Sequence, residues 1–119
     1  MTIATTLPIR DVTEAAACCS PLTREPLGAT EADDLARALK AIADPARLRI
    51  ISIVAASADG EACVCDLTEP IGLSQPTVSH HLKVLTEAGF LDRTKRGTWA
   101  YYRLRAGALD ALSDVLTAA

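Results

Sequence analysis

The sequence has 119 residues, 50% of them hydrophobic and 23% charged, a size that suits one compact domain and excludes several. Aromatic residues make up only 3%, so the core must be aliphatic and stacking side chains for single-stranded nucleic acids are scarce. The net charge of −3 argues at first against any nucleic-acid partner. Residues 74–105, however, hold 6 basic and 2 acidic side chains, a local charge of +4 that predicts a nucleic-acid-binding surface.

Residues 1–29 are expected to form an N-terminal arm that carries the cysteine pair Cys18 and Cys19, because prolines and a glycine interrupt this stretch. At most a short helix from Val12 to Cys19 is predicted there, outside the core. The arm lacks the pattern of a secretory signal, and the longest apolar stretch, residues 50–58, is too short to span a bilayer. We therefore expect a cytoplasmic protein without a membrane partner.

Residues 30–119 are expected to form the folded domain, which begins with two consecutive helices. Thr30 is the predicted N-cap of the first helix, which ends near Ala43 and has one apolar face. Asp44 followed by Pro45 predicts the start of the second helix, whose apolar residues extend around much of its circumference. A helix of that kind belongs in the middle of the fold.

The next segments predict a winged helix. A brief helix over residues 66–69, a turn that contains Gly72, and a second helix capped by Ser74 and running to Gly89 have the pattern of a helix-turn-helix. The period then changes toward two over residues 90–104, which indicates a β-hairpin with a basic tip. The expected fold class is therefore mainly α with a β-hairpin wing.

The last segment, residues 106–119, predicts a short amphipathic helix. Such a short helix does not bury its apolar stripe fully by itself. We expect a second copy of the chain to cover it, so that the protein dimerises through its terminal helices.

The second helix of the helix-turn-helix is expected to present hydrogen-bonding side chains to the major groove, while the wing contacts phosphates or the minor groove. A solvated helix often carries such residues, but the order of helix, turn, helix and basic wing favours duplex DNA as the partner. The predicted DNA-binding residues are Ser74, Gln75, Thr77, Ser79, His80 and Lys83 in the helix and Arg93, Lys95 and Arg96 in the wing.

Catalytic motifs are missing from the sequence. The adjacent residues His80 and His81 point about 100° apart on a helix and do not converge on one ion. No set of serine, histidine and acid, no glycine-rich phosphate loop and no zinc-protease pattern is present. An enzymatic function is therefore not expected.

The four cysteines form two pairs, Cys18 with Cys19 and Cys63 with Cys65. In a reducing compartment, paired thiols are more typical of soft-metal ligands or redox groups than of disulfides. Three alternatives stay open: buried free cysteines, a structural zinc site despite unusual spacing, and a regulatory dithiol switch. The favoured hypothesis is a sensing site for a thiophilic ion.

Three segments of the sequence resemble the ArsR/SmtB family of winged-helix metal-sensing repressors. They are residues 44–50 (DPARLRI), 63–67 (CVCDL) and 73–89 (LSQPTVSHHLKVLTEAG), and the resemblance extends over about residues 33–116. The resemblance implies a homodimer that represses a resistance operon until an inducer binds and the DNA is released. The operator DNA is expected to be an imperfect inverted repeat.

The resemblance also implies an inducer. Arsenic-sensing members of the family have a third cysteine where this sequence has Thr68, and trivalent arsenic binds three thiolates. Cys18 and Cys19 are therefore expected to complete a site with Cys63 and Cys65 for As(III) or Sb(III), with no organic cofactor. Cadmium or lead, which suit four thiolates, are the alternative inducers. Sensors of zinc or nickel use ligands on the last helix, and no histidine follows His81 to supply one.

Overall fold

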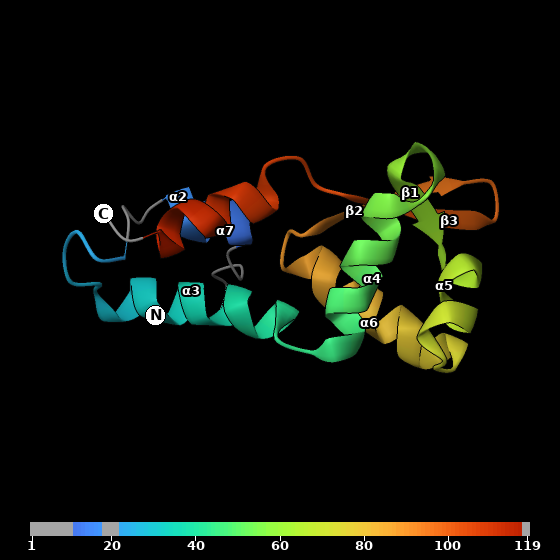
Figure 1. Ribbon diagram of the computed structural model, residues 1–119, viewed down its shortest axis with the longest axis horizontal. Coiled ribbons are helices and arrows are strands. Elements are labelled where there is room, and N and C mark those ends of the chain that lie inside the picture. Colours follow the sequence, from blue (N-terminus) through green and yellow to red (C-terminus); the bar gives the residue numbers. More distant parts are fainter. Residues whose placement is uncertain (1–10, 18–21, 118–119) are drawn as a thin grey trace, which may run out of the picture.

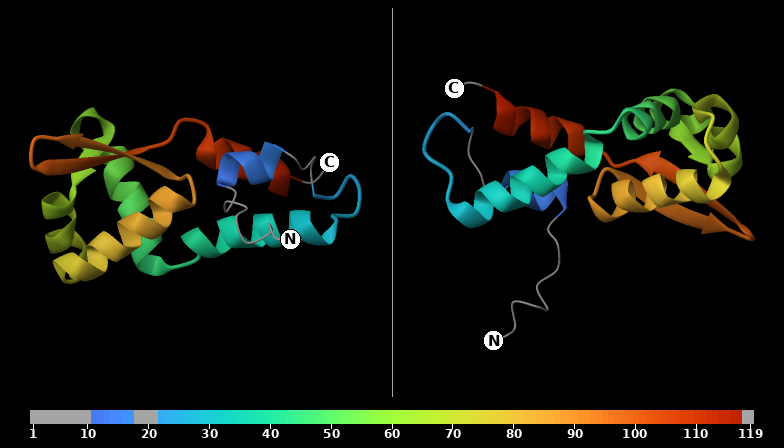
Figure 2. Two further views of the ribbon diagram at one scale, coloured as in Figure 1. Left: turned by 180° about the vertical axis from the view of Figure 1, so that it is seen from behind. Right: turned by 90° about the horizontal axis from the view of Figure 1, so that it is seen from below.

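The computed structural model describes residues 11–17 and 22–117 and confirms a winged helix-turn-helix. Figure 1 shows α2, α3 and α7 at one end of the molecule and the remaining helices with the sheet at the other, and the views in Figure 2 agree. No helix in the described part of the chain has the length and apolar character needed to cross a membrane. In chain order the elements are α2 (Val12–Ala17), α3 (Ala29–Ile42), α4 (Pro45–Ala56), a 3-10 turn (Ala58–Gly60), β1 (Glu61–Cys63), α5 (Val64–Ile71), α6 (Gln75–Glu87), β2 (Leu91–Arg96), β3 (Trp99–Leu104) and α7 (Ala108–Leu116).

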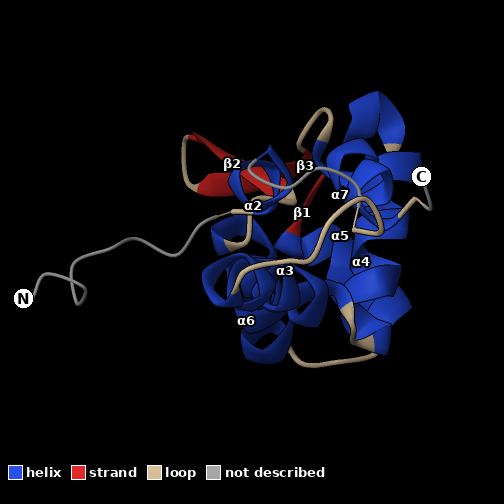
Figure 3. Cartoon of the chain, turned by 90° about the vertical axis from the view of Figure 1, so that its left-hand side faces the viewer, coloured by secondary structure: helices blue, strands red, loops and turns tan. Residues whose placement is uncertain are grey.

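The sheet is antiparallel with the strand order β1-β3-β2, and Figure 3 shows its strands gathered at one edge of a largely helical molecule. Strands β2 and β3 are the predicted wing hairpin. Strand β1 was not predicted, because three residues are too few to show an alternating pattern. It pairs Glu61 with Arg103 and Cys63 with Tyr101, and so joins the first cysteine of its pair directly to the wing.

Helix α4 begins as predicted and lies at the centre of the fold. The Asp44 Oδ1 atom accepts hydrogen bonds from the backbone nitrogens of Ala46 (2.9 Å) and Arg47 (3.1 Å). The helix buries Ile50 and Val54 completely. Leu48 of the same helix is 51% exposed.

We expect Asp44→Ala to lower the folding equilibrium constant about fivefold at pH 7, the usual consequence of losing an N-cap. Hydrogen bonds from the backbone nitrogens of Arg47 and Ala46 hold the pKa of Asp44 below its ordinary value of 3.8. A carboxylate with a lowered pKa stabilises the fold above its ordinary pKa and loses that effect as the pH falls through the lowered pKa. Urea denaturation of the wild type, Asp44→Ala and Asp44→Asn at several pH values tests both points, because alanine removes the cap, whereas asparagine keeps the cap but does not titrate.

The start of α3 differs from the prediction by two residues. Gly28, rather than Thr30, is the N-cap, and the Glu31 Oε1 atom accepts a hydrogen bond from the Gly28 backbone nitrogen (2.8 Å). A glutamate at the third helical position favours this start, because its side chain satisfies the nitrogen of the cap residue. The start predicted at Thr30 would instead place Asp33 at the third helical position.

Helix α2 is part of the core, contrary to the expectation that the arm stays outside it. The predicted helix is present, but Val12 and Ala15 are fully buried and α2 packs against α7. The Val12 backbone nitrogen donates to the Ala88 carbonyl oxygen (2.7 Å), and Arg105 Nη1 lies 2.7 Å from Asp11 Oδ2. The physical reason is that the apolar stripe of α7 needs a cover, and α2 of the same chain supplies part of it.

Helix α6 begins as predicted and buries one apolar face. The Ser74 Oγ atom accepts a hydrogen bond from the Thr77 backbone nitrogen (3.4 Å). Val78, Leu82 and Leu85 are fully buried. This packing determines which face of α6 is left exposed.

Candidate nucleic-acid interface and cysteine site

The outward face of α6 carries the residues predicted to contact DNA. Gln75, Thr77, His80 and Lys83 are exposed, and Ser79 is half-buried. They occupy the first turns of a helix whose N-terminus carries a partial positive charge. This arrangement suits contacts with phosphates and with base edges in a major groove.

Two of the polar groups at this end of α6 also hold the local structure together. Ser74 caps the helix, and its Oγ lies 3.0 Å from Thr77 Oγ1. His81 is half-buried, and its Nδ1 lies 3.2 Å from Arg47 Nη1 on α4. His80, by contrast, is exposed, which agrees with the angle of about 100° between adjacent residues on a helix.

The cationic side chains of the wing are all exposed, but one of them, Arg96, already has an acidic partner. Arg93, Lys95 and Arg96 are all exposed on β2. Arg96 nevertheless contacts the carboxylate of Glu61 on β1, from Nη1 to Oε2 and from Nη2 to Oε1 (2.9 Å). Arg103 Nη2 contacts the same Oε1 at 2.7 Å. Sequence reasoning missed Glu61, because its meeting with Arg96 depends on how β1 pairs with the wing.

This ion cluster shifts the ionisation of its members. The hydrogen bond from Arg96, helped by that from Arg103, holds the pKa of Glu61 below its ordinary value, although partial burial opposes the shift. Glu61 in turn raises the pKa of Arg96. The Glu61–Arg96 pair therefore stays charged at neutral pH and is lost only as the pH falls through the lowered pKa of Glu61.

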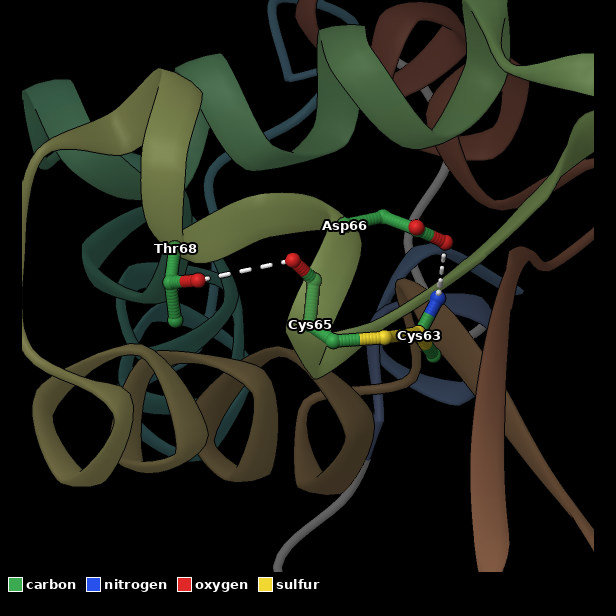
Figure 4. The surroundings of a disulfide bond; sticks show 4 residues. All are labelled: Cys63, Cys65, Asp66 and Thr68. Atoms are coloured by element: carbon green, nitrogen blue, oxygen red, sulfur yellow. Dashed lines mark hydrogen bonds between the residues drawn. A yellow bond between two sulfur atoms is a disulfide. The ribbon is translucent and has the colours of Figure 1, made fainter.

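Cys63 and Cys65 lie at the junction of β1 and α5, where Figure 4 shows them joined by a disulfide. Cys63 is buried and Cys65 is exposed. Helix α5 packs against α6, so a change at this junction is one helix away from the candidate DNA-contacting face. The other two predicted ligands, Cys18 and Cys19, lie outside the described residues.

Asp66 is the third potential ligand at this junction. The Cys63 and Cys65 sulfurs and an Asp66 carboxylate oxygen all lie within 4.8 Å of one another. Asp66 Oδ2 also accepts a hydrogen bond from the Cys63 backbone nitrogen (3.1 Å). Sequence reasoning did not select Asp66, although its position next to Cys65 was a usable signal. Reduced to thiolates, the two cysteines offer a soft ion two donors from one turn of the chain.

The position that holds a third cysteine in the resembled arsenic sensors is occupied by a hydroxyl. Thr68 lies on α5, and its Oγ1 donates to the Cys65 carbonyl oxygen (3.4 Å) in Figure 4. This junction therefore offers two cysteine sulfurs and a hydroxyl at these three positions.

The fold and the exposed face of α6 define a winged helix-turn-helix regulator of transcription. Residues 44–93 match the family model described as "Bacterial regulatory protein, arsR family". The arsenical resistance operon repressor of Staphylococcus xylosus is 37% identical over 83 residues, 70% of this chain and 77% of that protein. The chain belongs to the arsR family.

Other comparisons agree with this assignment. The arsenic resistance transcriptional regulator ArsR1 of Pseudomonas putida is 48% identical over 65 residues, which is 55% of this chain but only 49% of that regulator. The structure of an antimony-specific transcriptional repressor covers 76% of this chain and 80% of its own, with a TM-score of 0.63 and 27% identity. A homodimeric winged helix-turn-helix domain from Mycobacterium bovis covers 75% and 83%, with a TM-score of 0.61 and 27% identity.

Proposed function

We propose that this protein is a homodimeric repressor that binds operator DNA and is released from it by As(III) or Sb(III). The observation that carries the proposal is the placement of Cys63 and Cys65 at the start of α5, which packs directly against α6 and its exposed polar face. An inducer site and a DNA-reading helix are thereby adjacent in one small domain. The names of the relatives, two arsenic-related and one antimony-specific, support this choice of inducer.

The proposed ligand set is Cys63 and Cys65 with at least one of Cys18 and Cys19. Trivalent arsenic takes three sulfur ligands, and the described residues place only two cysteine sulfurs at the junction of β1 and α5. Helix α2 ends at Ala17, directly before Cys18 and Cys19 in the sequence. Figure 1 places α2 and α5 at opposite ends of the molecule, so this ligand set would join the arm of one protomer to Cys63 and Cys65 of its partner.

The proposed dimer uses the end of the molecule that carries α7. Leu109 and Leu116 of this helix are 38% and 46% exposed, although α2 covers part of its apolar face. The homodimeric neighbour from Mycobacterium bovis supports the same assembly. Two α6 helices would then enter major grooves about one helical turn apart, which requires an inverted-repeat operator.

The release of DNA requires that the inducer bind the DNA-free state more tightly, by about 1–3 kcal/mol for typical allosteric coupling. A mobility-shift titration with duplex DNA from upstream of the gene, under reducing conditions, tests this. We expect arsenite or antimonite to dissociate the complex at lower concentration than cadmium or lead. If all four ions leave the complex intact, the proposed sensor function is wrong. Release by cadmium or lead alone selects the alternative inducers.

We expect the double variant Cys18→Ser/Cys19→Ser to bind the same duplex as the wild type but to need much more arsenite for release, because one thiolate of the set is missing. A response equal to that of the wild type contradicts a role for the arm. Circular dichroism of the variant checks that α2 still folds.

The disulfide between Cys63 and Cys65 favours a second candidate, a thiol redox switch on the same scaffold. Hydrogen peroxide would oxidise the two thiols to the disulfide and be reduced to two water molecules. Peroxide that releases DNA in metal-free buffer, with binding restored by dithiothreitol, would select this function. Release by arsenite under reductant, without a peroxide effect, rejects it.

A further inference from the structure

The side chain of Glu61 is the meeting point of β1 and the wing. It is 12% exposed, although it lies among arginines that are more than half exposed. Its Oε1 accepts from Arg96 Nη2 (2.9 Å) and Arg103 Nη2 (2.7 Å), and its Oε2 accepts from Arg96 Nη1. One carboxylate thus binds a cation from each strand of the hairpin.

Arg96 is turned back along the sheet by these contacts. Both of its Nη atoms face the Glu61 carboxylate, which is the two-point geometry that an arginine otherwise offers to a phosphate. Its Cζ also lies 4.7 Å from the centre of the Tyr101 ring. A phosphate therefore competes with Glu61 for the same edge of the guanidinium group.

We propose that Glu61 is a positioning residue that withholds Arg96 from DNA and thereby limits the affinity of the wing. This inference rests on the proposed DNA-binding function, and it adds a residue that regulates the affinity for DNA. Glu61 lies two residues before Cys63 on the same strand, and Cys63 pairs with Tyr101, over which Arg96 is placed. A ligand that moves this strand therefore also moves the carboxylate that holds Arg96.

The test is a double-variant cycle of Glu61→Gln and Arg96→Gln, read as affinity for duplex DNA by fluorescence anisotropy at several salt concentrations. We expect Glu61→Gln to bind roughly fivefold more tightly at low salt, because one more cation reaches a phosphate. The slope of log affinity against log salt concentration should steepen by about 0.9. In the Arg96→Gln background, the same change at Glu61 should have no effect on the slope.

Arg103→Gln is the matched control, since it removes the other arginine that contacts Glu61 and leaves the Arg96 pair in place. It should not steepen the salt dependence. Trp99, the single tryptophan of the sequence, is the cross-strand partner of Arg96 and reports on the pair without DNA. Its emission should change with Glu61→Gln in the wild-type background but not in Arg96→Gln.

Two failures can be told apart. A wild type without any affinity for duplex DNA overturns the proposed function. The role of Glu61 is overturned if the wild type binds duplex DNA but Glu61→Gln raises the affinity equally in the wild-type and Arg96→Gln backgrounds. That result would show a general effect of the lost negative charge.

Discussion

Cys63→Ser and Cys65→Ser are each expected to abolish the release of DNA by arsenite while leaving the affinity for duplex DNA unchanged. The site has two sulfurs from one turn of the chain, and the loss of either leaves a trivalent ion with too few thiolates. The proposed DNA-contacting face lies on α6, whose buried stripe of Val78, Leu82 and Leu85 is unchanged in both variants. The measurement is anisotropy of labelled duplex DNA during an arsenite titration under reductant.

A gain-of-ligand variant sharpens this test. Thr68→Cys adds a thiol to α5 at the position where the resembled arsenic sensors have one. In a chain that lacks Cys18 and Cys19, Thr68→Cys should restore the arsenite response. An arsenite response that persists in Cys63→Ser or Cys65→Ser contradicts the assignment of the site.

Gly89→Ala is expected to lower the free energy of unfolding by about 3 kcal/mol, since left-handed backbone costs about 1–2 kcal/mol for other residues and overpacking a further 1–3 kcal/mol. Gly89 has a φ of 90° between α6 and β2. A Cβ atom added there would lie 2.5 Å from the Asp11 Cβ atom, which is backbone-proximal and cannot rotate away. The clash falls where α2 is attached to the domain.

Two variants separate these causes in urea denaturation. Gly97→Ala has a φ of 64° and no heavy atom within 4 Å of the added Cβ, so it should show the cost of the backbone alone. Asp11→Gly removes the clashing atom and should recover part of the loss in the double variant. If Gly89→Ala costs no more than Gly97→Ala, the described packing of α2 is wrong.

The helix starts at Asp44 and Ser74 could be predicted from the sequence because capping is local: the side chain, the nitrogens it accepts from and the following proline are neighbours. The burial of Val12 could not be predicted from the sequence, since it depends on packing against α7, which lies about a hundred residues later in the chain. The exposure of Leu48 could not be predicted either, because apolarity alone does not say which side of α4 is covered.

The candidate site divides in a similar way. The exposed face of α6 followed from its apolar period, which leaves Gln75, His80 and Lys83 outward. The engagement of Arg96 by Glu61 could not be predicted, because it requires the register of β1 against β3. The place of Asp66 beside the two sulfurs depends on the turn from β1 into α5, where its carboxylate accepts a hydrogen bond from the Cys63 backbone nitrogen.

The central claim is that DNA and a thiolate-bound ion favour different states of one molecule, and such coupling is reciprocal. The most direct measurement is an arsenite titration of the reduced protein, followed by its sulfur-to-arsenic absorption, with and without saturating duplex DNA from upstream of the gene. We predict that the duplex weakens arsenite binding by the same factor, about 5- to 150-fold, by which arsenite weakens duplex binding. Equal arsenite affinity in the presence and absence of the duplex would contradict the account.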